Sequence, residues 1–131
     1  MMKKILIIDD DVDMCILLSR YLTQNNYETV VADSGKIGME KFREQKFDIV
    51  LCDYLLGEDK DGIDILKQIK GEEPATIVLI ITAFPDVKTA VEVIKFGAHD
   101  YITKPIVPVE ILSIINNVMN PSLKSSAIDV D

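Results

Sequence analysis

The sequence predicts an α/β fold, in which a single doubly wound parallel sheet carries helices on both of its faces. Short apolar runs, typical of strands buried on both faces, alternate from end to end with stretches of helical periodicity. There are five such strand–helix pairs, with no linker between them. Because parallel strands are joined by crossovers and antiparallel strands by short hairpins, this strict alternation favours a mostly or wholly parallel sheet.

The predicted strands are short and mostly apolar, and they occupy residues 4–8, 28–32, 49–53, 76–81 and 100–103. The predicted helices follow them at residues 12–25, 35–45, 63–70, 87–96 and from about 108 onward. Pro74 separates the third helix from the fourth strand, because proline cannot continue a helix.

Polar residues and a glycine mark several helix ends. Ser34 and Asp86 are candidate N-caps, because their side chains can accept hydrogen bonds from free N–H groups of the first turn. Gly97 can adopt the left-handed conformation that ends the fourth helix. The first, fourth and fifth helices each carry an apolar stripe at helical spacing: Met14, Leu17, Leu18 and Tyr21; Val87, Ala90, Val91 and Ile94; Ile111, Ile114, Ile115 and Val118.

Length and composition indicate one domain with a sizeable core. The chain has 131 residues, of which 48% are hydrophobic and 27% charged, as in ordinary globular proteins. Its net charge of −8 and its scattered basic residues argue against direct nucleic-acid binding, and favour cations and basic partners. No apolar run approaches the roughly 20 residues of a membrane span, and no signal peptide precedes the first strand. We therefore expect a cytoplasmic protein without a membrane span, with Cys15 and Cys52 as buried, reduced thiols.

Acidic residues follow two of the predicted strands. The first strand runs directly into three aspartates at residues 9–11, and the third strand ends in Asp53. In doubly wound sheets the site lies beyond the carboxyl ends of the strands, so these carboxylates should meet Thr82 and Lys104 from the fourth and fifth strands. Asp11 is better placed to start the first helix, where its charge suits the helix dipole.

Three carboxylates at one edge of a sheet require a cation. At an effective dielectric constant near 20, two carboxylates about 5 Å apart repel by roughly 3 kcal/mol, and one lysine cannot offset several such terms. Asp9, Asp10 and Asp53, with a backbone carbonyl and water, match the ligands that Mg²⁺ prefers. Beside the ion an aspartate can attack phosphorus, while Lys104 and the Thr82 hydroxyl contact phosphoryl oxygens. The sequence therefore predicts a Mg²⁺ site for phosphoryl chemistry.

These motifs resemble the receiver domain of bacterial two-component response regulators. The matching elements are the aspartates after the first strand, Asp53, Thr82–Ala83 in ITA, and Tyr101 and Lys104–Pro105 in YITKP. Their order and spacing hold over Lys3 to about Asn120, nearly the whole chain. Residues 81–105 look most like receivers attached to activators of the nitrogen-regulation type.

The resemblance implies a flavodoxin-like fold, with a single doubly wound five-stranded parallel sheet in the strand order 2-1-3-4-5 and five helices. The receiver domain would occupy residues 1–120, and residues 121–131 would be a polar tail or a truncated linker. Such a domain is a phosphoacceptor switch that catalyses only its own phosphorylation and dephosphorylation. It would control a partner or an output domain in two-component signal transduction, as in transcription regulation.

The resemblance also assigns the site residues. Asp53 would accept a phosphoryl group from a sensor histidine kinase or a phosphotransfer protein. Asp9, Asp10 and Asp53 would hold Mg²⁺ together with the backbone carbonyl of Leu55.

The other matching residues would couple phosphorylation to a change of shape. Thr82 and Lys104 would bind the phosphoryl oxygens, and Tyr101 would turn inward when Thr82 moves. The peptide bond before Pro105 would be cis, a conformation that costs little only before proline. A homodimer could form through the face of the fourth helix, fifth strand and fifth helix.

The chain departs from the family pattern near the site. Gly57 stands where the family usually has proline, and the loop from Gly57 to Gly62 is one residue longer than the common form. Leu55 and Phe84 occupy the two flanking positions that influence hydrolysis in this family, and both are apolar. We predict slow self-dephosphorylation, because neither side chain can position an attacking water.

Other functions remain open on the residues alone. An aspartate-nucleophile phosphohydrolase would share this chemistry, but it typically has an acid two residues after the nucleophile, where this chain has Leu55. A flavin-binding electron carrier would need a Ser/Thr-rich loop after the first strand, where this chain has aspartates. A degenerate receiver is a further alternative, although every expected site residue is present. The single histidine, His99, is expected in a surface loop.

Overall fold

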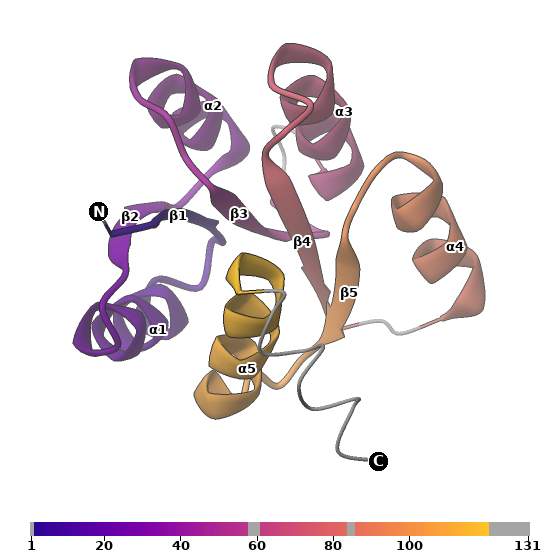
Figure 1. Ribbon diagram of the computed structural model, residues 1–131. Helices are drawn as coiled ribbons and strands as arrows, with labels where there is room; N and C mark the ends of the chain where they lie inside the picture. The colour runs from indigo at the N-terminus through magenta and orange to yellow at the C-terminus, as the bar shows by residue number, and fades with distance from the viewer. Residues whose placement is uncertain (1, 58–60, 84–85, 121–131) are drawn as a thin grey trace.

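All five predicted strands form in the computed structural model, which describes residues 2–57, 61–83 and 86–120 (Figure 1). They are β1 (Lys4–Ile8), β2 (Glu28–Ala32), β3 (Ile49–Asp53), β4 (Ile77–Thr82) and β5 (Asp100–Thr103). The strands pair in parallel in the order β2-β1-β3-β4-β5, which confirms the predicted flavodoxin-like strand order. The predicted tail at residues 121–131 lies outside the described residues.

The helices cover both faces of this sheet. They are α1 (Val12–Gln24), α2 (Gly35–Glu44), α3 (Gly62–Glu72), α4 (Val87–Lys95) and α5 (Pro108–Met119). α1 and α5 lie on one face, and α2, α3 and α4 lie on the other (Figure 1). No helix in the described ranges combines the length and apolar character needed to cross a membrane.

The sheet divides the hydrophobic core into two layers. In β1, Ile5 and Ile7 pack on the side of α1 and α5, whereas Leu6 and Ile8 pack on the side of α2 and α3. All four side chains have an exposed fraction of 0%. Because successive side chains of a strand point to opposite faces, burial of both faces explains why the apolar run is unbroken.

The strand register brings the predicted site residues together. Ile8 of β1 pairs with Cys52 of β3, so the next residues, Asp9 and Asp53, lie level at the carboxyl end of the sheet. On the other side of β3, Asp53 pairs with Ile81 of β4. The predicted cluster therefore follows from the pairing of β1, β3 and β4.

Side-chain caps start the helices where the sequence predicts them. Ser34 Oγ accepts a hydrogen bond from the Ile37 N–H at 3.1 Å, and Asp86 Oδ1 accepts one from the Thr89 N–H at 2.7 Å. Gly97 follows α4 with a φ of +106°, which confirms the predicted left-handed residue.

The apolar stripe predicted for α1 is partly wrong. Cys15, Leu18 and Leu22 are the buried residues of this helix, whereas Leu17 is 60% exposed. In this rotation the Cys15 thiol donates to the carbonyl oxygen of Asp9, with Sγ and the oxygen 3.4 Å apart. For α5 the prediction holds at its centre, since Ile111 and Ile115 are buried.

The apolar stripe of α4 points away from the core. Val87, Val91 and Ile94 are 80%, 61% and 48% exposed, and Val93 is the buried residue of the helix. An amphipathic helix usually turns its apolar stripe toward the core. The structure therefore shows an exposed apolar face on α4, formed by Val87, Val91 and Ile94.

Both cysteines are buried and free, as predicted. Cys15 lies in the layer of α1 and α5, and Cys52 lies in the opposite layer. Burial raises the pKa of the Cys15 thiol to about 12 and also raises the pKa of the Cys52 thiol. Neither thiol is therefore a thiolate near neutral pH.

Candidate functional site

The predicted carboxylate cluster forms at the carboxyl end of the sheet. Oxygen atoms of Asp9, Asp10 and Asp53 all lie within 4.8 Å of one another. Asp9 and Asp53 are buried, with exposed fractions of 0% and 5%, whereas Asp10 is exposed. The cluster thus has a buried floor and one carboxylate open to solvent.

Lys104 joins the two buried carboxylates. Its Nζ lies 3.1 Å from Asp9 Oδ2 and 3.1 Å from Asp53 Oδ2. The backbone places it there, because the Lys104 N–H donates to the Thr82 carbonyl at 2.7 Å. The Lys104–Pro105 peptide bond is cis, as predicted. β4 and β5 therefore hold the ammonium over the ends of β1 and β3.

Backbone N–H groups bind the other oxygen of each buried carboxylate. Asp9 Oδ1 accepts a hydrogen bond from the Asp11 N–H at 2.9 Å, and Asp53 Oδ1 accepts one from the Leu55 N–H at 3.3 Å. Asp11 also caps α1, so the prediction that it starts this helix is confirmed. These bonds aim both Oδ2 atoms at Lys104.

The charges of the site are not balanced by its one ammonium. Burial raises the pKa of Asp9, and the charge of Asp53 adds to this, against the opposing effects of the Asp11 N–H and of Lys104. Burial by itself lowers the pKa of Lys104, but its interactions with the Asp53 and Asp9 carboxylates outweigh burial, so that its pKa is raised. The ammonium is thus firmly protonated, while the buried Asp9 carboxylate remains destabilised.

One buried carboxylate oxygen of the site has spare acceptor capacity. Among the described residues, Asp9 Oδ2 has an ion pair with Lys104 but no partner with hydrogen-bond geometry. A buried carboxylate oxygen with spare acceptor capacity, beside two further carboxylates, suits a hard divalent cation. The donor set of Asp9, Asp10 and Asp53 therefore fits Mg²⁺.

Thr82 and Tyr101, the predicted switch residues, lie on β4 and β5. Thr82 ends β4 and is buried, with an exposed fraction of 1%. Tyr101 lies in β5, is partly buried, and packs against the core layer of α2, α3 and α4. Leu55 is 48% exposed, and Phe84 lies outside the described residues, as do residues 58–60 of the loop predicted to be longer. His99 is exposed between α4 and β5, as predicted.

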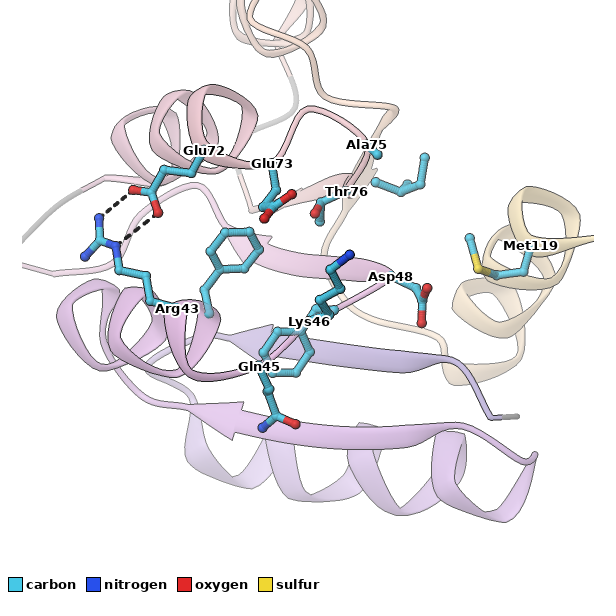
Figure 2. Close-up of a pocket in the computed structure, with 12 residues that line it drawn as sticks. Arg43, Gln45, Lys46, Asp48, Glu72, Glu73, Ala75, Thr76 and Met119 are labelled. Atoms are coloured by element: carbon cyan, nitrogen blue, oxygen red, sulfur yellow. Dashed lines mark hydrogen bonds and ion pairs between the residues drawn. The ribbon is translucent and has the colours of Figure 1, made fainter.

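A pocket of about 720 Å³ lies at the opposite end of the sheet. Figure 2 shows its lining, which includes the ion pair of Arg43 and Glu72 and the residues Asp48 and Thr76, just before β3 and β4. None of the clustered carboxylates lines it, so this pocket is separate from the site.

Gly62, the first residue of α3, is not among the predicted site residues but contacts the backbone next to Asp53. Its N–H donates to the carbonyl of Tyr54 at 2.7 Å, directly behind Asp53. The signal was present as Asp61 followed by Gly62, because Asp61 is the N-cap and places α3 one residue earlier than predicted.

Comparison with known proteins identifies the family. The family model of the response regulator receiver domain matches residues 5–116, and the chain belongs to this family. Members accept a phosphoryl group and switch conformation in two-component signalling, and they bind Mg²⁺ through acidic residues.

Individual relatives agree with this assignment. The transcriptional regulatory protein ZraR of Escherichia coli K12 is 48% identical over 102 residues, which are 78% of this chain and 23% of ZraR. The chemotaxis protein CheY of Thermotoga maritima is 34% identical over 117 residues, which are 88% of this chain and 97% of CheY. The chain thus spans less than a quarter of ZraR but nearly all of CheY.

Solved structures share the fold. The receiver domain protein of Methanospirillum hungatei superposes with a TM-score of 0.87 at 26% identity, over 95% of this chain and 99% of that one. The receiver domain protein of Clostridium thermocellum superposes with a TM-score of 0.84 at 31% identity, over 92% of this chain and 97% of that one.

Proposed function

We propose that Asp53 is the phosphoacceptor of this receiver domain. The observation that carries the proposal is the position of Asp53, a buried carboxylate 3.1 Å from Lys104 Nζ within a cluster of three carboxylates. In the proposed step, an Asp53 carboxylate oxygen attacks phosphorus and the P–N bond to the imidazole of a donor histidine breaks. The bonding electron pair stays on that nitrogen.

Mg²⁺ would be held by Asp9, Asp10, Asp53 and the backbone carbonyl of Leu55. When bound, the ion supplies positive charge that offsets the carboxylates and the phosphoryl oxygens. The chain's own groups orient the reaction: the Leu55 N–H holds one Asp53 oxygen, and Lys104 pairs with the other. Lys104 and the Thr82 hydroxyl are then the proposed contacts of the phosphoryl oxygens, and Tyr101 is the proposed switch aromatic.

The test is intact mass after incubation with acetyl phosphate and Mg²⁺. We expect a gain of one phosphoryl group that disappears in EDTA and in Asp53→Asn. Asp13→Asn is the matched control, since Asp13 is an exposed aspartate in the first turn of α1. An adduct that persists in Asp53→Asn would place the acceptor elsewhere. Rapid turnover of acetyl phosphate without an adduct would favour the hydrolase instead.

The donor we propose is a sensor histidine kinase or a phosphotransfer protein, and the reaction site is cytoplasmic. The domain catalyses only its own phosphorylation and dephosphorylation. The receiver unit is proposed to cover residues 1–120, which the match at residues 5–116 supports, with residues 121–131 as a tail or linker. Because the relative ZraR is a transcriptional regulatory protein, transcription control is the proposed output.

A homodimer through α4, β5 and α5 is the proposed active assembly. The exposed apolar face of α4, formed by Val87, Val91 and Ile94, supports this choice. Apolar area of this kind is stabilised by burial against a partner.

A further inference from the structure

α3 begins in direct contact with the backbone of the proposed phosphoacceptor. A Cβ atom added to Gly62 would lie 2.5 Å from the Asp53 carbonyl oxygen and 2.8 Å from the Tyr54 Cα. Both distances are far below the 3.4 Å at which ordinary contact begins. Because these neighbours are backbone atoms, they could move only by displacing the end of β3.

The other glycines of this layer differ from Gly62. A Cβ on Gly38 would meet Ile8 Cδ1 at 2.6 Å, Cγ1 at 2.9 Å and Cγ2 at 3.1 Å, but all three are side-chain atoms and none belongs to the backbone. A Cβ on Gly71, in the same helix as Gly62, would meet nothing within 4 Å. Of these three glycines, only Gly62 is pressed against the backbone of the site.

Hydrogen bonds hold the segment after Asp53 from both sides. The Gly62 N–H donates to the Tyr54 carbonyl at 2.7 Å, from the side of α3. The Tyr54 N–H donates to the Ile81 carbonyl at 2.7 Å, from the side of β4. The Leu55 N–H in turn donates to Asp53 Oδ1, so the backbone that follows Asp53 also orients its carboxylate.

We infer that Gly62 is a positioning residue for the Mg²⁺ site. Its missing side chain lets the first turn of α3 press on the Asp53–Tyr54 peptide and hold the Asp53 carboxylate and the Leu55 carbonyl at the distance that the ion needs. This inference rests on the proposed role of both groups as Mg²⁺ ligands. Mg²⁺ demands near-ideal octahedral geometry with oxygen distances of about 2.0–2.1 Å, so a small backbone displacement weakens its binding.

The test compares Mg²⁺ affinity and metal-free stability in three variants of the full chain. Calorimetric titration with MgCl₂ gives the dissociation constant, and thermal unfolding in EDTA gives the stability. We expect Gly62→Ala to raise the dissociation constant by about tenfold or more, as loss of a supporting group does at metal sites. Gly71→Ala, the matched control in α3, should stay within about twofold of wild type, since it creates no contact.

Gly38→Ala separates positioning from simple loss of stability. It should lower the unfolding temperature but leave Mg²⁺ affinity unchanged, because its clash is with the Ile8 side chain. The second substitution Ile8→Ala removes Cδ1, Cγ1 and Cγ2, the three atoms that the added Cβ would meet, so the double variant should lose less stability than the two single substitutions lose together. No second substitution can relieve the clashes of Gly62→Ala in this way, because they involve backbone atoms.

Hydrogen exchange on the wild-type chain tests the inference without any variant. Mg²⁺ should slow exchange of the Gly62 amide more than that of the Gly71 amide, because ligation of the Leu55 carbonyl would fix the segment that Gly62 binds. An equal effect on both amides, or wild-type Mg²⁺ affinity in Gly62→Ala, would overturn the inference. If wild type itself binds no Mg²⁺, the proposed function fails first, so the two failures are distinct.

Discussion

At the scale of single residues, one ammonium serves two buried carboxylates. Lys104 Nζ is equally distant from Asp9 and Asp53, and Asp10 adds a third negative charge at the solvent side. Burial raises the pKa of Asp9, and the Asp11 N–H and Lys104 offset this effect only in part. The metal-free site is therefore organised for a cation at a cost in stability.

The raised pKa of Asp9 predicts a pH-dependent stability of the metal-free protein. Folded Asp9 binds its proton more readily than the unfolded chain, whose value is near 3.8. The contribution of Asp9 to the unfolding free energy is therefore fully present below pH 3.8 and is lost as the pH rises through the pKa of Asp9 in the folded protein. In EDTA, the unfolding free energy of wild type relative to Asp9→Asn should fall as the pH rises above the unfolded value of 3.8, by no more than about 1.4 kcal/mol per pH unit.

Urea unfolding at a series of pH values measures this difference. Asp9→Asn serves as the reference because carboxylates far from the cluster, such as Glu72 with its lowered pKa, titrate equally in both proteins. A difference that is flat or rises with pH would contradict the prediction.

Leu55 predicts a long-lived phosphoryl group. Its side chain is 48% exposed beside Asp53 but has no group that can orient water. We expect Leu55→Gln to shorten the phosphoryl half-life by about tenfold or more, because a positioned polar group assists proton transfer from water. The decay of the phosphorylated mass after removal of acetyl phosphate measures it. Ile16→Gln, at an exposed position of α1, is the control, and a wild-type half-life of seconds in Mg²⁺ would refute the slow-hydrolysis hypothesis.

At the scale of secondary-structure elements, strands and helices differ in how far local pattern decides them. Every strand contributes side chains to both core layers. Its apolar run can therefore be predicted without knowing which face of the strand points to which layer. A helix contributes one face only, and α1 and α4 each have more apolar residues than their buried face uses. The surplus on α4 is the exposed apolar face of Val87, Val91 and Ile94.

The exposed face of α4 predicts a phosphorylation-dependent dimer that a charge will disrupt. Val91 lies at its centre, and burying a glutamate there without a partner costs several kcal/mol. We expect Val91→Glu to remain monomeric in beryllofluoride and Mg²⁺, whereas wild type dimerises, as judged by sedimentation velocity. Leu17→Glu, equally exposed on α1, should dimerise like wild type. If Val91→Glu still dimerises, the interface lies elsewhere.

At the scale of the whole molecule, the parallel sheet gathers distant residues at one edge. Asp9, Asp53, Thr82 and Lys104 come from four strand ends, and the register of β1, β3, β4 and β5 brings them to the same edge of the sheet. Mg²⁺ binding by such a site is coupled to folding, because the unfolded chain does not assemble it.

This coupling predicts stabilisation by Mg²⁺. At a free concentration about 100 times the dissociation constant, Mg²⁺ should raise the unfolding free energy by about 2.7 kcal/mol. The gain should be much smaller in Asp10→Asn, which removes one proposed ligand at an exposed position, while Asp13→Asn should keep it. Equal stabilisation of all three proteins would show that the ion binds elsewhere. Chemical unfolding with and without MgCl₂ provides the comparison.

The sequence pattern by itself determined the strands, their parallel direction and the members of the carboxylate cluster. These features are local, because a doubly buried strand needs a continuous apolar run and a parallel sheet gathers whatever follows its strands at one edge. Tertiary structure alone decided which side of α1 and α4 faces the core and that Gly62 touches the backbone of Asp53. Helix rotation and close approach depend on the shape of the sheet beneath, and chain segments far apart in the sequence build that shape together.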